Sequence, residues 1–491
     1  MNKLLLFTGG LLLVGCGILL FLFGAEVVQP VRASAAAQSN SADPRLKNAY
    51  RFSKGGWAYA HLEGSPSEIG FQHGYLLAPE IADGFNVEKV SSTHATQRDW
   101  EFFRKTAREI LWPKIDPEYQ QELQGIADGL RARGIAMDLW DVVALNAKEE
   151  VPDYYVPWLN KQEKAKNAPE LKSPGNCSAF VATGSWTKDH KVVIGHNDWT
   201  SYASGERWFV ILDIVPQNGH RILMDTYPGL IASGDDFGIN SDGIMITETT
   251  ISQFAGFDPN GKPEFVRARK ALQYAKSIDD YVRIMLDGNN GGYANDWLLA
   301  DRKTGEIARF ELGLKHHKVW RTKDGYFEGS NFASDPELIK DETEGFDYND
   351  LSTSPNARRV RWQQLMQQYK GKIDVALAQK FLADHYDTWQ KKEEANERTL
   401  CGHVDVSPRG IPEWSWGPFH PGGAVQNKVT DSSMAEQMTI VAHTGHACGE
   451  RFEAASFLQK HGDKYGWQKE ILRDMPSDPW TTFKSGEKQN P

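Results

Sequence analysis

A sharp change of pattern at residue 177 divides this 491-residue sequence into a helical part and a part that begins with strands. Residues 160–175 are charged and turn-rich and include Pro169 and Pro174, which is typical of a surface linker. A strand-like segment that begins with Cys177 follows at once. We therefore expect segments 38–159 and 177–491 to build one domain, joined by a linker over residues 160–176.

The elements expected on the two sides of this linker differ in type. A capping box from Ser65 to Glu68, with Pro66 at the first helical position, starts the first helix. Further helices are predicted over residues 100–111, 118–133, 138–148, 264–277, 279–287, 356–368 and 375–386. Strands are predicted over residues 178–186, 191–196, 208–215, 221–225, 243–250, 295–300, 306–312 and 437–443. Because helices and strands come in blocks rather than in strict alternation, the pattern favours an α+β fold over a doubly wound sheet.

The composition supplies a large core and argues against nucleic-acid partners. Hydrophobic residues make up 40% of the chain, and the formal net charge is −10. An acidic chain lacks the basic surface with which proteins bind nucleic acid. The sequence also has no Gly-x-Ser-x-Gly elbow, no phosphate loop and no Gly-x-Gly-x-x-Gly after a strand. We therefore expect no nucleic-acid partner and no cofactor.

The first 37 residues predict export. Lys3 precedes an apolar run over residues 4–25, and Ala33-Ser34-Ala35 fits a cleavage site of small residues. The run is also long enough to span a bilayer, so an uncleaved anchor is the alternative. We expect segment 1–37 to be a signal peptide or a membrane anchor. The protein is then periplasmic or extracellular, either free or tethered by this segment.

The cysteines outside that segment are Cys177, Cys401 and Cys448. An odd number in an exported protein suggests one disulfide and one free thiol, and Cys401 with Cys448 is the natural pair. The alternative is a tetrahedral zinc site with ligands from the runs Cys401-Gly402-His403 and His443-x-x-His446-x-Cys448. Neither run has the spacing of a zinc finger, and an exported setting favours the disulfide. We expect a Cys401–Cys448 disulfide and no metal.

Cys177 is the candidate nucleophile. A cut between Asn176 and Cys177 would give the thiol its own base, a free α-amine with an ordinary pKa of about 7.7–8.0. The next predicted strand leads into His196-Asn197-Asp198, and antiparallel pairing with the strand after Cys177 would bring these side chains beside the thiol. From the residues alone, an ordinary buried cysteine and a polar turn remain the alternatives.

A series of short runs resembles the phospholipase B-like family of N-terminal nucleophile hydrolases. The runs lie in the family's order between residues 173 and 434: Asn176-Cys177-Ser178-Ala179, Gly195-His196-Asn197-Asp198-Trp199, Tyr227-Pro228-Gly229, Asp235-Asp236-Phe237, Glu248-Thr249-Thr250-Ile251, Asn295-Asp296-Trp297, Gly329-Ser330-Asn331, Ser354-Pro355-Asn356-Ala357-Arg358-Arg359, and Gly422-Gly423 through Lys428-Val429-Thr430. An earlier run, Gly70-x-x-His73-Gly74, resembles the related penicillin acyltransferase-type autoproteolytic family.

The resemblance implies a four-layer αββα core and a precursor that cleaves itself between Asn176 and Cys177. The thiol would then attack an acyl carbonyl while its α-amine transfers the proton, and water would resolve the thioester. The catalytic residues implied by position are Cys177, His196, Asn197, Asp198 and Asn331. The implied substrate-binding or orienting residues are Asp236, Thr249, Thr250 and Arg358, with Arg359 as a near-equal choice to Arg358.

The leading functional hypothesis is therefore an exported, self-processing hydrolase that cleaves acyl ester or amide bonds in lipid-like substrates. The second is an amidase or acyltransferase of the penicillin acyltransferase type, which would prefer N-acyl small molecules. The third is a non-catalytic protein that keeps the fold and binds amphiphiles, which a chain that never cleaves would indicate.

Overall fold

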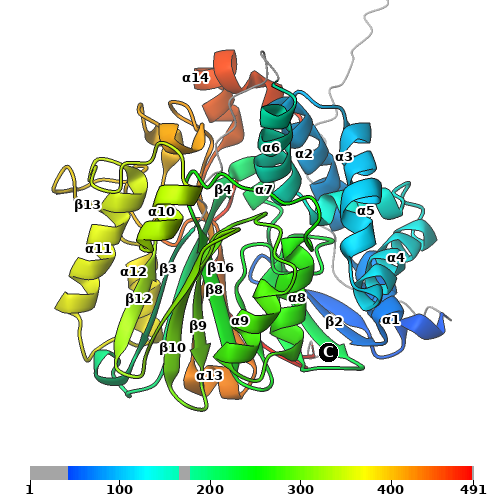
Figure 1. Ribbon diagram of the computed structural model, residues 1–491, viewed down its shortest axis with the longest axis horizontal. Coiled ribbons are helices and arrows are strands. Elements are labelled where there is room, and N and C mark those ends of the chain that lie inside the picture. Colours follow the sequence, from blue (N-terminus) through cyan, green and yellow to red (C-terminus); the bar gives the residue numbers. More distant parts are fainter. Residues whose placement is uncertain (1–42, 165–176, 489–491) are drawn as a thin grey trace, which may run out of the picture. The chain divides into compact units, whose positions relative to one another are not determined.

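Two β-sheets lie face to face between layers of helices in the computed structural model, which describes residues 43–164 and 177–488 (Figure 1). The nine-stranded sheet contains, in spatial order, β1 (Tyr50–Lys54), β2 (Trp57–Gly64), β5 (Val210–Pro216), β6 (Ile222–Thr226), β7 (Gly238–Asn240), β8 (Ile244–Thr250), β9 (Asn295–Asp301), β10 (Glu306–Leu312) and β11 (His317–Thr322). The six-stranded sheet contains β12 (Gly325–Gly329), β3 (Ser178–Thr183), β4 (Val193–Ser201), β15 (Gly422–Asp431), β16 (Thr439–Thr444) and β17 (Thr481–Lys484). A small hairpin joins β13 (Tyr386–Asp387) and β14 (Lys392–Glu393).

Helices form the two outer layers and also connect strands at the ends of the sheets. They are α1 (Pro66–Leu76), α2 (Ala78–Thr96), α3 (Trp100–Thr106), α4 (Pro117–Ala132), α5 (Leu139–Asn146), α6 (Val156–Gln162), α7 (Tyr202–Gly205), α8 (Glu264–Tyr274), α9 (Ile278–Leu286), α10 (Pro336–Glu342), α11 (Ser354–Gln368), α12 (Val375–Leu382), α13 (Ser432–Glu436) and α14 (Ala454–Tyr465). Helices α1 to α5, α8 and α9 pack on the nine-stranded sheet, whereas α11 and α12 pack on the six-stranded sheet (Figure 1).

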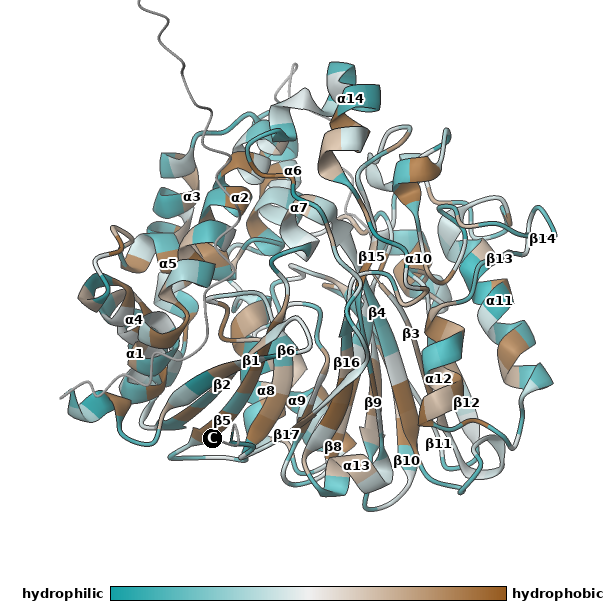
Figure 2. Ribbon diagram, turned by 180° about the vertical axis from the view of Figure 1, so that it is seen from behind, coloured by the Kyte–Doolittle hydropathy of each residue, from teal (hydrophilic) through white to brown (hydrophobic). Residues whose placement is uncertain are grey.

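Side-chain alternation along the strands builds the core between the two sheets. Ala179 and Val181 of β3 belong to the cluster between the sheets, together with Met245 of β8 and Leu298 of β9. The intervening Phe180 points to the other face, where it packs with α11 and α12. In Figure 2 apolar segments lie on strands such as β8 and β10, while helices such as α3 and α5 alternate between apolar and hydrophilic residues. The predicted α+β class and four-layer αββα core are confirmed.

The run Gly70-x-x-His73-Gly74 lies on α1, which crosses α4 at close range. A Cβ atom at Gly70 would lie 1.9 Å from the Glu122 carbonyl oxygen, and one at Gly74 would lie 2.1 Å from that of Ile126. Between the two glycines, His73 Nε2 accepts a hydrogen bond from the Gly229 amide at 3.2 Å. Burial lowers the pKa of His73 to about 3, which keeps the imidazole neutral and able to accept. This run therefore ties α1 to α4 and to the Tyr-Pro-Gly turn.

Some predictions shift at their boundaries, and others fall outside the described residues. The Ser65–Glu68 capping box is present, with Glu68 Oε2 accepting from the Ser65 amide at 2.8 Å. Helix α6 continues to Gln162, so the predicted linker is helical where it begins, because Trp158 and Leu159 still pack on the core. The predicted export segment 1–37, the linker from residue 165 and Asn176 at the predicted cleavage site lie outside the described residues. Within 43–164 and 177–488, no helix combines the length and apolar character that crossing a membrane requires.

Candidate active site

Cys177 lies directly before the central strand β3 and is fully buried. Its φ angle is 98°, in the region that favours glycine. A non-glycine residue held in a sparsely populated backbone region costs about 1–3 kcal/mol and persists only where its surroundings fix it. The strain thus falls on the residue that follows the predicted scissile bond.

Pairing of β3 with β4 brings two of the predicted residues to the thiol. Ser178 lies opposite Asn197, and Ala179 lies opposite His196. The Cys177 Sγ atom lies 3.9 Å from Asp198 Oδ1, within reach of a weak S–H···O bond. A ring nitrogen of His196 also lies within 4.8 Å of that sulfur. The expected juxtaposition of Cys177 with the end of the next strand is therefore present.

Asn197 is turned away from the Cys177 thiol. Successive side chains of a strand point to opposite faces, so Asn197 faces α12 while His196 and Asp198 face the other sheet. Its amide nitrogen donates to the Leu382 and Leu400 carbonyl oxygens, both at 2.9 Å. The structure thus gives Asn197 a contact with the loops behind β4 instead of one with the thiol.

Arg358 connects Cys177 to the strands on either side of β3. Its Nη1 donates to the Cys177 carbonyl oxygen at 2.7 Å, and its Nη2 donates to Asn331 Oδ1 at 2.8 Å. The guanidinium also lies over the Trp199 ring, with 4.3 Å from Cζ to the ring centroid. Burial lowers the pKa of Arg358 to about 9, so the group is still charged at neutral pH. Arg359, the near-equal choice, instead donates to the Tyr348 carbonyl oxygen at 3.3 Å.

Asn331 is held in turn by the end of β8. Its amide nitrogen donates to the Thr250 carbonyl oxygen at 2.9 Å, and its backbone N–H lies 3.4 Å from Thr249 Oγ1. Asn331 has a φ of 68°, which directs its side chain from the turn after β12 toward Arg358. The predicted residues Asn331, Thr249, Thr250 and Arg358 therefore form one hydrogen-bonded framework that ends at Cys177.

The electrostatics of the site oppose ionisation of Asp198 and of the Cys177 thiol. Burial, reinforced by the charge of Asp235, raises the pKa of Asp198 to about 8. Burial and the neighbouring carboxylates of Glu248 and Asp198 raise the pKa of the Cys177 thiol. Burial and Lys428 lower the pKa of His196. At neutral pH the intact chain thus holds a thiol, a neutral imidazole and a protonated Asp198, and activation of the thiol requires a further base.

Residues that the sequence reasoning did not select complete the site. Glu248 Oε1 lies 3.7 Å from the Cys177 sulfur and accepts from the Tyr293 hydroxyl at 3.1 Å. Beneath them, Lys428 of β15 is fully buried and ion-paired with Asp225 at 3.1 Å and with Asp235. Glu248 lies in the Glu248-Thr249-Thr250-Ile251 run, and its position as an acidic residue within a predicted strand was the sequence signal that could have identified it.

Asp236 lies among these buried acids. It has a φ of 56°, and its Oδ2 atom has no hydrogen-bond partner among the described residues. Burial and the nearby charge of Glu248 raise the pKa of Asp236. The structure therefore places Asp236 in the acidic surroundings of Cys177, without a direct contact that would define its role.

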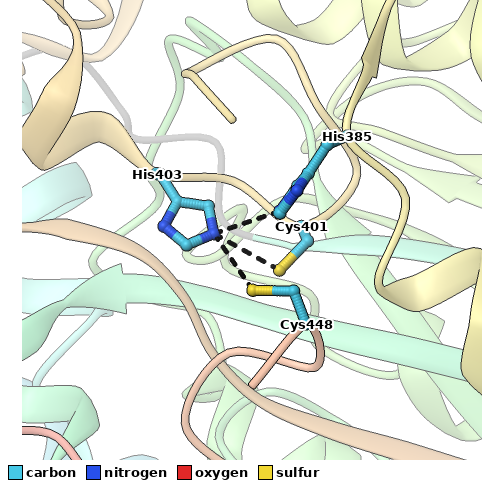
Figure 3. Close-up of side chains that lie close together, drawn as sticks. All are labelled: His385, Cys401, His403 and Cys448. Atoms are coloured by element: carbon cyan, nitrogen blue, oxygen red, sulfur yellow. Dashed lines mark hydrogen bonds between the residues drawn. The ribbon is translucent and has the colours of Figure 1, made fainter. Parts of the chain in front are cut away.

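The predicted Cys401–Cys448 disulfide is wrong, because both residues are free thiols in the structure. Both sulfur atoms lie on the Nε2 side of the His403 ring, at 3.6 Å and 3.5 Å from that nitrogen (Figure 3). The His385 Nε2 atom lies 3.2 Å from the same nitrogen. The two sulfurs and the two imidazole nitrogens thus lie around a shared centre, all within 4.8 Å of one another.

Sequence comparison places the chain among phospholipase B relatives. The family model described as Phospholipase B matches residues 82–320. Phospholipase B of Crotalus adamanteus is 25% identical over 77% of this chain and 75% of its own length, and human Phospholipase B-like 1 is 23% identical over 77% and 74%. An uncharacterized protein of Archaeoglobus fulgidus is 27% identical over 50% of this chain, which spans 41% of that protein.

Among solved structures, the chain matches a variant of conjugated bile acid hydrolase from Clostridium perfringens. The match covers 55% of this chain and 89% of the other, with 12% sequence identity and a TM-score of 0.30.

Proposed function

We propose that this chain, which resembles phospholipase B and phospholipase B-like 1, is a hydrolase of that family whose nucleophile is the Cys177 thiol. In this proposal the chain first cleaves itself before Cys177 and then hydrolyses acyl ester or amide bonds in lipid-like substrates. The observation that carries it is the Arg358 guanidinium, which holds both the Cys177 carbonyl oxygen and Asn331.

Self-processing uses the strain and the donors around Cys177. The thiol attacks the carbonyl carbon of the preceding peptide bond, and the amide nitrogen leaves with a proton as the α-amine of Cys177. Water then hydrolyses the resulting thioester, which releases a carboxylate on residue 176 and restores the thiol. Breaking this bond also frees the φ angle of 98° that the intact chain imposes on Cys177.

The new α-amine supplies the base that the intact site lacks. An unperturbed α-amine has a pKa of about 7.7–8.0, so at neutral pH it exchanges a proton readily with a thiol beside it. The thiolate attacks the acyl carbonyl, the leaving group departs with the proton from the amine, and water resolves the thioester. Asp198, protonated below about pH 8, lies at 3.9 Å from the sulfur and is placed to orient this exchange.

The substrate proposal is an amphiphile that carries an acyl ester or amide. It follows from the family names, phospholipase B and phospholipase B-like, and from the cysteine chemistry, which suits both bonds. An N-acyl small molecule remains the second candidate, because the Gly70-x-x-His73-Gly74 run resembles the acyltransferase-type family. We also propose that the protein acts outside the cytoplasm, since residues 4–25 have the apolar pattern of an export segment.

Intact mass and N-terminal sequencing of the purified protein test the proposal. We expect a fragment of about 35 kDa that begins Cys-Ser-Ala-Phe from the unmodified chain, and a single uncut chain from Cys177→Ala. Release of fatty acid from phospholipid is then compared with hydrolysis of N-acyl amino acids, with Cys177→Ala as the blank. A chain that stays whole at neutral and acid pH and hydrolyses neither substrate would contradict the proposal and favour the amphiphile-binding alternative.

A further inference from the structure

Four side chains that the proposed hydrolysis does not use converge behind β4. They are His385, which precedes β13, Cys401 and His403 in the loop after β14, and Cys448 in the loop after β16 (Figure 3). Their ligand atoms all lie within 4.8 Å of one another. Three loops that are distant in sequence thus meet at one point with two thiols and two imidazoles.

The spacing of these atoms is that of a tetrahedral metal site. With Zn–N bonds of about 2.0–2.1 Å and Zn–S bonds of about 2.3 Å, ligand atoms at tetrahedral angles are separated by about 3.3 Å for two nitrogens and about 3.6 Å for nitrogen and sulfur. His403 Nε2 lies 3.2 Å from His385 Nε2. The same nitrogen lies 3.6 Å from the Cys401 sulfur and 3.5 Å from the Cys448 sulfur. These three separations agree with the edges of such a tetrahedron.

The geometry points to a structural Zn²⁺ site formed by His385, Cys401, His403 and Cys448. Thiolate and imidazole ligands select zinc over calcium and magnesium, which require oxygen ligands. Four protein ligands leave no open coordination position, which is the arrangement of a structural site and not of a catalytic one. His443 and His446, the other histidines near Cys448 in sequence, are not ligands.

The surroundings support the ligands. His403 Nδ1, on the far side of its ring, lies 3.6 Å from Glu450 Oε2, and metal-bound histidines commonly face a carboxylate in this way. The His446 ring stacks on His403 with 3.8 Å between centroids. The backbone N–H of Cys401 donates to the Asp384 carbonyl oxygen at 3.1 Å, which couples the loop of Cys401 to the loop of His385. The site is thus ordered by contacts that do not involve the metal.

This zinc would stabilise the loops that pack on β4, on the side of the strand that faces away from Cys177. Asn197 of β4 donates to Leu382 and Leu400, which flank the segment between α12 and the site. A Cβ atom at Gly402 would lie 2.0 Å from the Trp199 ring, so this loop packs closely on Trp199. The Arg358 guanidinium lies over the same ring. The zinc therefore fixes the loops against which β4 and Trp199 are packed.

Metal analysis of the full-length protein, purified without chelator from zinc-supplemented medium, tests the inference. We expect about one zinc ion per chain in the unmodified protein, and little in Cys448→Ser or in His385→Asn, which changes a ligand that is partly exposed. His443→Asn is the matched control, because His443 instead contacts Asn427 and Ser477, and it should retain the metal. Cys177→Ala should also retain it, so loss of hydrolysis and loss of zinc are separate results.

Two further measurements use the unmodified protein and therefore test the inference even if a ligand variant fails to fold. Chelator treatment of the unmodified protein should lower its Tm, and Co²⁺ added back should give the visible absorption of tetrahedral cobalt with a thiolate charge-transfer band. A metal-free protein that takes up neither Zn²⁺ nor Co²⁺ overturns the inference. So does an intact mass lower by two hydrogen atoms, since that result would show a Cys401–Cys448 disulfide.

Discussion

At the scale of single residues, the adjacent arginines Arg358 and Arg359 make different contacts, and only those of Arg358 reach Cys177. Arg358 donates through two nitrogens to Cys177 and Asn331, whereas Arg359 donates to Tyr348. A lysine supplies a point charge and cannot reproduce the two-pronged contact. We expect Arg358→Lys to slow self-processing by about 10²-fold or more, as loss of one oriented donor does in other acyl-transfer sites.

Arg359→Lys is the matched control and should process at nearly the unmodified rate. The rate is followed as the fraction of cleaved chain with time after refolding. Equal rates for the two variants would contradict the assignment of Arg358 to the site.

The raised pKa of Asp198 predicts how the stability of the protein changes with pH. Its pKa is raised to about 8 in the folded state, above its ordinary value near 4, so the folded chain binds more protons than the unfolded chain between these values. The contribution of Asp198 to stability is therefore complete below about pH 4 and is lost as the pH rises through about 8. We expect Tm to fall between pH 5 and pH 8, and to fall less steeply in Asp198→Asn, which keeps the neutral form.

The comparison is made on the Cys177→Ala background so that both chains are uncut. If Tm falls with pH as steeply in Asp198→Asn as in the chain that keeps Asp198, groups other than Asp198 cause the pH dependence.

At the scale of elements, many helices and strands follow from local pattern, but helices α2, α10 and α14 and strand β15 lie outside the predicted ranges. Gln426, Asn427 and Lys428 are polar, so the strand lacks the apolar alternation that would predict it. They are buried because partners from distant segments satisfy them, such as Asp225 for Gln426 and Lys428. For the site, the sequence predicted that β4 would pair with β3 beside Cys177. It did not predict that the Asn197 side chain points away from the thiol, because that direction depends on the register of the two strands.

Removal of the buried cation of β15 should destabilise the six-stranded sheet. Lys428→Ala leaves Asp225 and Asp235 without their counter-charge, and breaking a buried pair in this way costs about 3–5 kcal/mol. Urea unfolding of uncut chains measures the loss. Lys188→Ala, which removes the exposed ion pair with Asp374, should leave the unfolding midpoint almost unchanged. Similar midpoints for the two variants would argue against a structural role for the Lys428 pairs.

The close crossing of α1 and α4 predicts that Gly74 does not tolerate a side chain. In Gly74→Ala the new Cβ would lie 2.1 Å from the Ile126 carbonyl oxygen, and backbone on a packed helix has little room to yield. We expect a loss of stability of about 1–3 kcal/mol or more. Gly462→Ala on α14 meets nothing within 4 Å and should be neutral or stabilising. Thermal unfolding distinguishes them, and an unchanged Tm for Gly74→Ala would mean that the two helices can separate.

At the scale of the whole molecule, the chain on either side of the predicted cut builds one core. Strand β2, from the N-terminal side, lies between β1 and β5 in the nine-stranded sheet and pairs with β5 from Ala58 to Gly64. Helices α1 to α5 share a hydrophobic cluster with α8 and α9 from the C-terminal side. Separation of the two segments would expose a sheet edge and a large apolar surface, which is unfavourable in water.

We therefore expect the cleaved protein to remain a single particle. Two bands should appear on denaturing gels, while size exclusion under native conditions should give one peak at the elution volume of uncut Cys177→Ala. A protease site placed within residues 165–176 of Cys177→Ala makes the same test independent of self-processing. Two peaks after native cleavage would show that the segments are separate folding units, which is incompatible with β2 as an interior strand of the shared sheet.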